Sequence, residues 1–255
     1  MNKPIIYLSL AAASLVSVSC AQRQYSVADV QRSRILVDSR YDAAPDREAV
    51  AFLQPYKDRV DSVMSPVMGV AACDMARFRP ESPLSNLLSD ILVWSSVRFG
   101  EKPAFSVYNI GGIRAAITRG NVTRGDILDV APFENKICFL TLRGSDVTEL
   151  FGQIVRAGGE GVSASVRLVG RGGQLVSATI DGKPVDPDAS YRIATIDYLA
   201  QGNDHLEAFK RKTGLVSPQS EENNARHLIE QYFLAMKAQG KSVEAKVEGR
   251  IVLEK

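Results

Sequence analysis

The amino-acid sequence predicts a mixed α/β fold in which strands and helices alternate along one domain. Apolar runs of strand length alternate with segments of helical periodicity, which is typical of layered α and β domains. The chain has 255 residues, of which 45% are hydrophobic and 24% charged. This composition can bury the core of one domain of roughly 200 residues without disulfides or a structural metal. We find no internal repeat or low-complexity segment.

The first twenty residues predict an export signal. Lys3 supplies a positive charge, residues 5–18 form a short apolar core, and small residues then lead to Cys20. The apolar core is too short to span a membrane. A cysteine in this place resembles the attachment site of a lipoprotein, whereas ordinary cleavage near Ala13 or Ser19 is the alternative. We expect a lipid anchor at Cys20 and a location in the bacterial cell envelope, either at the outer membrane or in the periplasm.

A polar segment and a helix follow. Residues 21–41 are rich in Arg, Gln and Ser and are interpreted as a tether. Apolar residues then recur at helical spacing between Pro45 and Val63, which predicts an amphipathic, linker-like helix within residues 42–65. The remaining residues, 66–255, form the predicted main domain.

The first half of this domain predicts strands at 67–73, 105–109 and 137–142. A helix is expected over residues 85–97, because its apolar residues share one face. These are Leu87, Leu88, Ile91, Leu92 and Val93.

A second helix is expected to begin at Ser145, a plausible N-cap, and to run to Arg156. The pair Gly158 and Gly159 would end it, since glycine readily adopts the left-handed conformation found after helices.

The second half of the domain predicts strands at 165–169, 175–180 and 191–195. Asp181 and Gly182 indicate a hairpin turn. A final amphipathic helix is expected over 222–238 and a last strand over 247–253.

Four short motifs occur in a recognisable order. Residues 108–114 read YNIGGIR, residues 125–135 read GDILDVAPFEN, residues 197–204 read DYLAQGND, and residues 248–251 read EGRI. Over residues 66–254 the chain resembles the C-terminal, nucleotide-recognising domain of the 5'-nucleotidases. The resemblance implies a four-layer α/β/β/α sandwich. It also implies a nucleoside or nucleotide ligand and a metallophosphatase domain, which holds two divalent metals and has no counterpart in this sequence.

Two aromatic residues match family positions that hold the base. Phe133 follows Pro132 in a predicted loop, and Tyr198 follows a predicted strand. Stacking of a base on an aromatic ring contributes about 1–3 kcal/mol and tolerates different bases. The alternative is that each ring packs against its own loop or core.

The remaining candidate site residues are polar or glycine. By resemblance, Asn109 bonds the base, Arg114 meets phosphate oxygens with its planar guanidinium, and Asp204 accepts the ribose hydroxyls. Gly111 and Gly112 would let the backbone approach the ligand, since they lack a Cβ. The alternatives are a turn with a solvated arginine and an aspartate that caps its own loop.

One departure concerns the phosphate end of the site. The family carries an arginine at the position of Pro80, and Arg79 is one residue away. Whether Arg79 takes the role of the missing arginine stays open at this point.

The sequence offers no metal site. Residues 125–129 spell GDxxD and residues 202–205 read GNDH, but the chain has only two histidines, His205 and His227. A two-metal phosphoesterase site needs several His and Asp ligands. Cys73 and Cys138 lie in apolar segments and are expected to be separate small side chains rather than a disulfide.

The net charge of +2, from 31 basic and 29 acidic residues, and the absence of a run of like charges argue against a nucleic-acid polymer as partner. Two functions remain. The chain is either the recognition subunit of a 5'-nucleotidase that needs a separate metallophosphatase chain, or a noncatalytic lipoprotein that binds nucleosides or nucleotides.

Overall fold

The computed structural model describes residues 26–254. The predicted signal segment and Cys20 lie outside these residues. Residues 26–52 contain a 3₁₀ turn, Ser39–Tyr41, whose N-cap is Asp38, and the first residues of helix α2. Within residues 26–254, no helix combines the length and the apolarity that crossing a membrane requires.

Helix α2 spans Arg47–Met64 and confirms the helix expected at 45–63. Asp46 begins it, because its carboxylate accepts the backbone N–H groups of Glu48 and Ala49 at 2.9 and 3.2 Å. Such a side chain satisfies donors that have no partner inside the helix.

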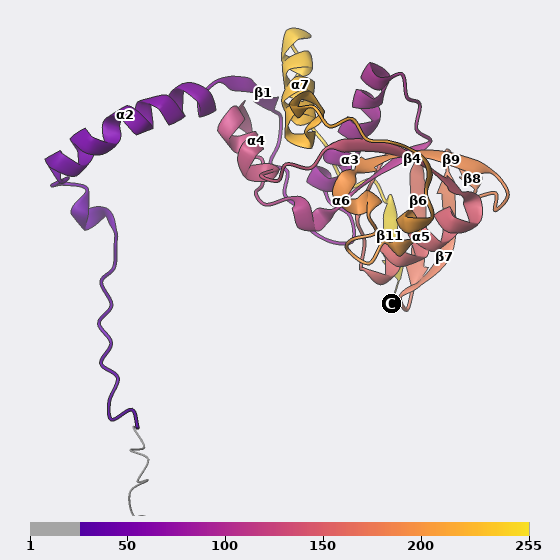
Figure 1. Cartoon of the computed structure of the whole chain (residues 1–255), viewed down its shortest axis with the longest axis horizontal. Helices are drawn as coiled ribbons and strands as arrows, with labels where there is room; N and C mark the ends of the chain where they lie inside the picture. The colour runs from indigo at the N-terminus through magenta and orange to yellow at the C-terminus, as the bar shows by residue number, and fades with distance from the viewer. Residues whose placement is uncertain (1–25, 255) are drawn as a thin grey trace, which may run out of the picture. The chain divides into compact units, whose positions relative to one another are not determined.

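The main body contains three sheets, shown in Figure 1. Strands β1 (Val67–Ala71) and β3 (Gly120–Thr123) form an antiparallel pair. The largest sheet has the order β10-β4-β9-β2-β5, and only β2 and β9 in it are parallel. Its strands are β10 (Thr213–Val216), β4 (Ile137–Arg143), β9 (Ser190–Ile196), β2 (Phe105–Tyr108) and β5 (Gly161–Val162).

The third sheet has the order β11-β6-β7-β8, with β11 parallel to β6. Its strands are β11 (Ile251–Glu254), β6 (Val166–Arg171), β7 (Gln174–Ile180) and β8 (Lys183–Pro184). Asp181 and Gly182 join β7 to β8 with φ angles of 50° and 73°. Two positive φ angles are the mark of a type I′ turn, so the expected hairpin is confirmed.

Helices pack against these sheets. Helix α3 (Pro83–Ser96) contacts β2, β5 and β9, and helix α5 (Gly144–Arg156) contacts strands of both larger sheets. Helix α7 (Ala225–Ala238) contacts β1 and α3. Two short helices, α4 (Arg124–Val130) and α6 (Asp197–Ala200), follow β3 and β9. The mixed α/β class predicted from the sequence, with sheets covered by helices, is confirmed.

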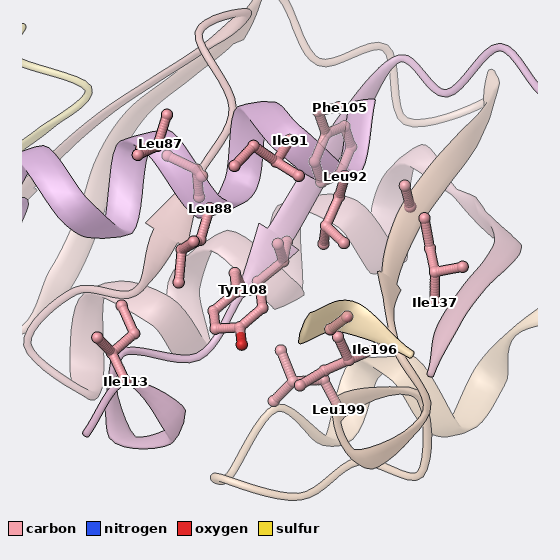
Figure 2. Packing of buried hydrophobic residues seen from close by; sticks show 14 of the residues in the cluster. Leu87, Leu88, Ile91, Leu92, Phe105, Tyr108, Ile113, Ile137, Ile196 and Leu199 are labelled. Atoms are coloured by element: carbon pink, nitrogen blue, oxygen red, sulfur yellow. The ribbon is translucent and has the colours of Figure 1, made fainter. Parts of the chain in front are cut away.

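One part of the core lies between α3 and the large sheet, and residues of α5 and α7 belong to the same buried cluster. Figure 2 shows Leu88, Ile91 and Leu92 of α3 on the side of the helix that faces Phe105 and Tyr108 of β2, and all five side chains are buried. Four of the five residues predicted for the apolar face of this helix are buried, and Val93 is half-buried at its border. This packing fixes β2, and the loop that follows β2 forms one wall of the candidate site.

Several predicted boundaries differ from those of the structure. Ser145 is not an N-cap, because α5 begins at Gly144 and its first N–H groups donate to the carbonyls of Ala189 and Pro187 at 2.8 and 3.1 Å. Gly144 has no room for a side chain, since a Cβ there would lie 1.8 Å from the carbonyl oxygen of Asp186.

The last strand also begins later than predicted. Its first four expected residues, 247–250, form no strand, because the carboxylate of Glu81 takes the backbone N–H groups of Glu248 and Arg250 at 2.7 and 2.8 Å. Helix α7 starts at Ala225 rather than Glu222, with Asn224 as its N-cap.

Other expectations agree with the structure. Helix α5 ends at Arg156, and Gly158 and Gly159 follow it with φ angles of 83° and 106°. Cys138 is buried and Cys73 half-buried, and both thiols are free.

Candidate functional site

A cavity of about 330 Å³ brings together all seven ligand-binding residues predicted from the sequence. They come from three segments that are far apart along the chain. Asn109 follows β2, the 3₁₀ turn Ile110–Gly112 comes next, Phe133 lies after α4, and Tyr198 and Asp204 lie in and after α6. The lining consists of Asn109, Gly111, Gly112, Arg114, Phe133, Asn135, Tyr198 and Asp204. Asn135 is the one lining residue that sequence reasoning did not single out.

Asp204 is held from two sides. The amide nitrogen of Asn109 donates to its Oδ2 and the hydroxyl of Tyr198 donates to its Oδ1, each at 2.8 Å. The bond to Asp204 is also the main reason why the pKa of Tyr198 is raised above its ordinary value. Asp204 itself has a φ of +54°, a left-handed conformation that aspartate tolerates better than most residues. The two hydrogen bonds therefore fix a carboxylate in an unusual backbone position.

The orientation of Asn109 follows from this contact. A carboxylate only accepts hydrogen bonds, so the NH₂ group of the amide must face Asp204. The oxygen Oδ1 is buried and has no hydrogen-bond partner among residues 26–254. This oxygen lies so close to Gly112 that a Cβ added to the glycine would be only 2.6 Å from it. Asn109 therefore supports Asp204 in this structure, and Gly112 is required by the position of the amide.

The two aromatic rings are open to the cavity. Phe133 is 47% exposed and Tyr198 is 37% exposed, although large apolar side chains are ordinarily buried. Rings that served only to pack the core would be covered. The guanidinium carbon of Arg114 lies 6.0 Å from the centre of the Phe133 ring, at the limit of a cation–π contact.

Two arginines contact the 3₁₀ turn Ile110–Gly112, which also lines the cavity. Arg114 reaches the carbonyl of Gly111 at 3.5 Å, and Arg77 donates to the carbonyl of Ile110 at 3.2 Å. Both side chains are exposed. Arg77 was not predicted, because only the loop that precedes α3 brings it to this turn. Two arginines thus contact this turn, and Arg114 of the two lines the cavity.

Arg79 does not line the cavity. Its guanidinium donates to the carbonyls of Ala157 (2.8 Å) and Gly159 and to the carboxylate of Glu160 (2.6 Å). Glu160 is only 1% exposed and also accepts the backbone N–H of Ile110 at 2.5 Å. Arg79 therefore supports the turn through Glu160 and is not among the residues that line the cavity.

Glu160 is a further residue that sequence reasoning missed. Burial is the main cause that raises its pKa, while the bonds from Ile110 and Arg79 act in the opposite direction. The only local signal was its place after two glycines with positive φ. A Cβ at Gly159 would lie 2.1 Å from the carbonyl oxygen of Pro80, so this close approach requires glycine.

The GDxxD motif of residues 125–129 lies in helix α4, and its first aspartate caps that helix. Asp126 accepts the backbone N–H of Thr123 at 2.7 Å, and Thr123 accepts the N–H of Asp126 at 3.2 Å, which together make a capping box for α4. His205 is exposed with a φ of +63°, and Nδ1 of His227 lies 4.0 Å from Glu230. Among residues 26–254, no three His, Cys, Asp or Glu side chains are grouped so that they could hold a metal ion.

Comparison with curated proteins gives relatives that are longer than this chain. The protein UshA of Yersinia enterocolitica is 31% identical over 169 residues, which cover 63% of this chain and 30% of UshA. A cell wall protein of Listeria monocytogenes is 26% identical over 234 residues, covering 82% of this chain and 29% of that protein. The chain thus spans less than a third of the length of these relatives.

A solved structure has the same fold. The 5'-nucleotidase precursor of Thermus thermophilus superposes with a TM-score of 0.68 at 24% identity, covering 83% of this chain and 44% of that one. Residues 67–211 match the family described as the C-terminal domain of 5'-nucleotidase. Since this match covers more than half of the residues, the chain belongs to the 5'-nucleotidase C-terminal domain family.

Proposed function

We propose that the cavity binds a nucleoside or a nucleoside monophosphate, and that the chain is the substrate-recognition part of an envelope 5'-nucleotidase. The observation that carries this proposal is the meeting of two exposed aromatic rings, Phe133 and Tyr198, with Asp204 in one cavity. The family and the names of the relatives support a nucleotide ligand.

Each part of such a ligand finds suitable chemistry in the cavity. The rings of Phe133 and Tyr198 offer π faces on which a base can stack. The fixed carboxylate of Asp204 offers lone pairs to ribose hydroxyls. Arg114 can donate two parallel hydrogen bonds to a phosphate, and Arg77 lies at the same turn. The chain thereby binds and orients the ligand.

Hydrolysis needs a water that two metals activate, and the side chains of residues 26–254 form no group that fits such a site. We therefore propose that a separate metallophosphatase chain holds two divalent metals and acts on the phosphate that Arg114 presents. A lipid anchor at Cys20 would keep the protein at the bacterial envelope, which agrees with a cell wall protein among its relatives.

The test is phosphate release from AMP with divalent metal present. We expect none from the purified chain alone and turnover when a cognate metallophosphatase chain is added. Metal-dependent release by the chain alone, above a contamination control, would contradict the proposal that catalysis needs a separate metallophosphatase chain. If the chain binds AMP but no metallophosphatase chain gains activity with it, the noncatalytic binding lipoprotein is the correct function.

A further inference from the structure

The segment 132–135 separates two cavities. Phe133 and Asn135 line the cavity described above, while Glu134 lines a second cavity of about 370 Å³. Other lining residues of the second cavity lie just before α7 or in its first turns, among them Asn224, Arg226 and His227. Neighbouring side chains of this short loop segment thus face different cavities.

Glu134 attaches the segment to α7. Nη2 of Arg226 donates to its Oε1 at 2.6 Å, and Nδ2 of Asn224 donates to its Oε2 at 2.7 Å. Each carboxylate oxygen thus has its own donor from the N-terminal end of α7 or its N-cap. Arg226 is also the main reason why the pKa of Glu134 is lowered.

The backbone of the segment is held by the same helix end. The N–H of Ala225 donates to the carbonyl of Asn135 at 2.8 Å, and Nη1 of Arg226 reaches the carbonyl of Pro132 at 3.4 Å. These contacts lie on either side of Phe133. Its backbone is therefore fixed at both ends from α7, while its ring projects into the first cavity.

We propose that Arg226, acting through Glu134, is a positioning residue that holds Phe133 where a base can stack on it. Arg226 lines the second cavity and not the first, so it acts on the ligand through the segment and not by contact. Its ion pair with Glu134 is partly exposed, with side-chain exposures of 21% and 72%, so its main effect is on geometry rather than on stability. This inference rests on the proposed function, because it concerns the same ligand.

The test compares Arg226→Ala, Arg226→Lys and a matched control, Arg143→Ala. Arg143 forms an ion pair of similar length with Asp188, 2.7 Å, on an exposed part of the surface that does not line the cavity. Adenosine binding is measured by calorimetric titration of the full chain. Amide hydrogen exchange of residues 132–136 is measured without ligand.

We expect Arg226→Ala to weaken adenosine binding by about three- to tenfold and to speed exchange in residues 132–136. Arg226→Lys should show smaller changes in both affinity and exchange than Arg226→Ala. Lysine keeps the charge but cannot reach Glu134 and Pro132 with one planar group. The control should change neither. A merely structural role would shift melting temperatures without this selective loss of affinity.

Unchanged affinity or unchanged exchange in Arg226→Ala would overturn the inference while leaving the proposed function intact. A wild-type protein that binds no nucleoside would instead refute the proposed function, and the inference with it. Equal losses in Arg226→Ala and Arg143→Ala would also overturn the inference, because the effect would then not be specific to the segment.

Discussion

The hydroxyl of Tyr198 donates a hydrogen bond of 2.8 Å to the carboxylate of Asp204. This bond joins one aromatic wall of the cavity to the carboxylate that we assign to the ribose. A second link runs through Asn203, the residue before Asp204. Its side-chain amide donates to the backbone carbonyl of Tyr198 at 2.8 Å. Ring and carboxylate are therefore expected to act as one unit.

Replacing Tyr198 by phenylalanine tests this coupling. The ring remains for stacking, but Asp204 loses one of its two donors, and a hydrogen bond to a charged group contributes about 1.5–3 kcal/mol. We expect weaker adenosine binding and a smaller loss for a 2',3'-dideoxynucleoside, which has no hydroxyls for Asp204. Calorimetric titration with both ligands measures the difference. Equal losses for the two ligands would show that Asp204 does not contact the ribose.

Arg114→Ala should distinguish AMP from adenosine. Only AMP offers a charged partner to the guanidinium, so its affinity should fall much more than that of adenosine. Parallel titrations with the two ligands, with Arg143→Ala as control, measure the selectivity. An equal fall for both ligands would mean that Arg114 acts by supporting Phe133 and not by binding phosphate.

Gly112→Ala should destabilise the site, whereas Gly111→Ala should leave the fold intact. A Cβ at Gly112 would lie 2.6 Å from the oxygen of Asn109 and would displace the amide from Asp204. A Cβ at Gly111 would lie 3.8 Å from Asp204, an ordinary contact distance. Thermal unfolding of both variants checks this. Equal melting temperatures would show that the amide can move without cost.

Glu160 predicts a dependence of stability on pH. Burial raises its pKa, so the folded state binds the proton more tightly than the unfolded state does. The stabilisation by this proton is complete below about pH 4.3, the ordinary pKa of a glutamate, and is lost as the pH rises through the folded-state value. A Glu160→Gln variant lacks this titration.

Urea unfolding of the wild type and of Glu160→Gln between about pH 4 and pH 7 measures the effect. The stability of the wild type relative to the variant should fall as the pH rises. A relative stability that rises with pH would show that the ion pair with Arg79 outweighs burial.

The sequence was informative where the pattern is local. The apolar face of α3 and the glycines after α5 follow directly from residue spacing and backbone preference. Short elements such as β3, β5, β8 and β10 were not predicted, because two to four residues carry too little periodicity. The start of α5 was misplaced because its caps come from a loop more than forty residues later.

The same limit applies to the cavity. The motifs named its lining residues, and the structure brings them together, but Glu160, Arg77 and Arg226 could not be found in this way. They act through contacts with backbone groups or side chains that lie 33 to 92 residues away in the sequence. Only the folded chain shows such contacts.

The aromatic pair tests the central claim most directly. Calorimetric titration with adenosine should show binding by the wild type and a loss of about 1–3 kcal/mol, roughly five- to hundredfold, in each of Phe133→Ala and Tyr198→Ala. Melting temperatures should be kept, because both rings are exposed and carry little core packing. The losses in the double variant should not simply add, since two rings that share one base are coupled. Unchanged affinity in both single variants, with their folds intact, would contradict the assignment of this cavity as a nucleoside site.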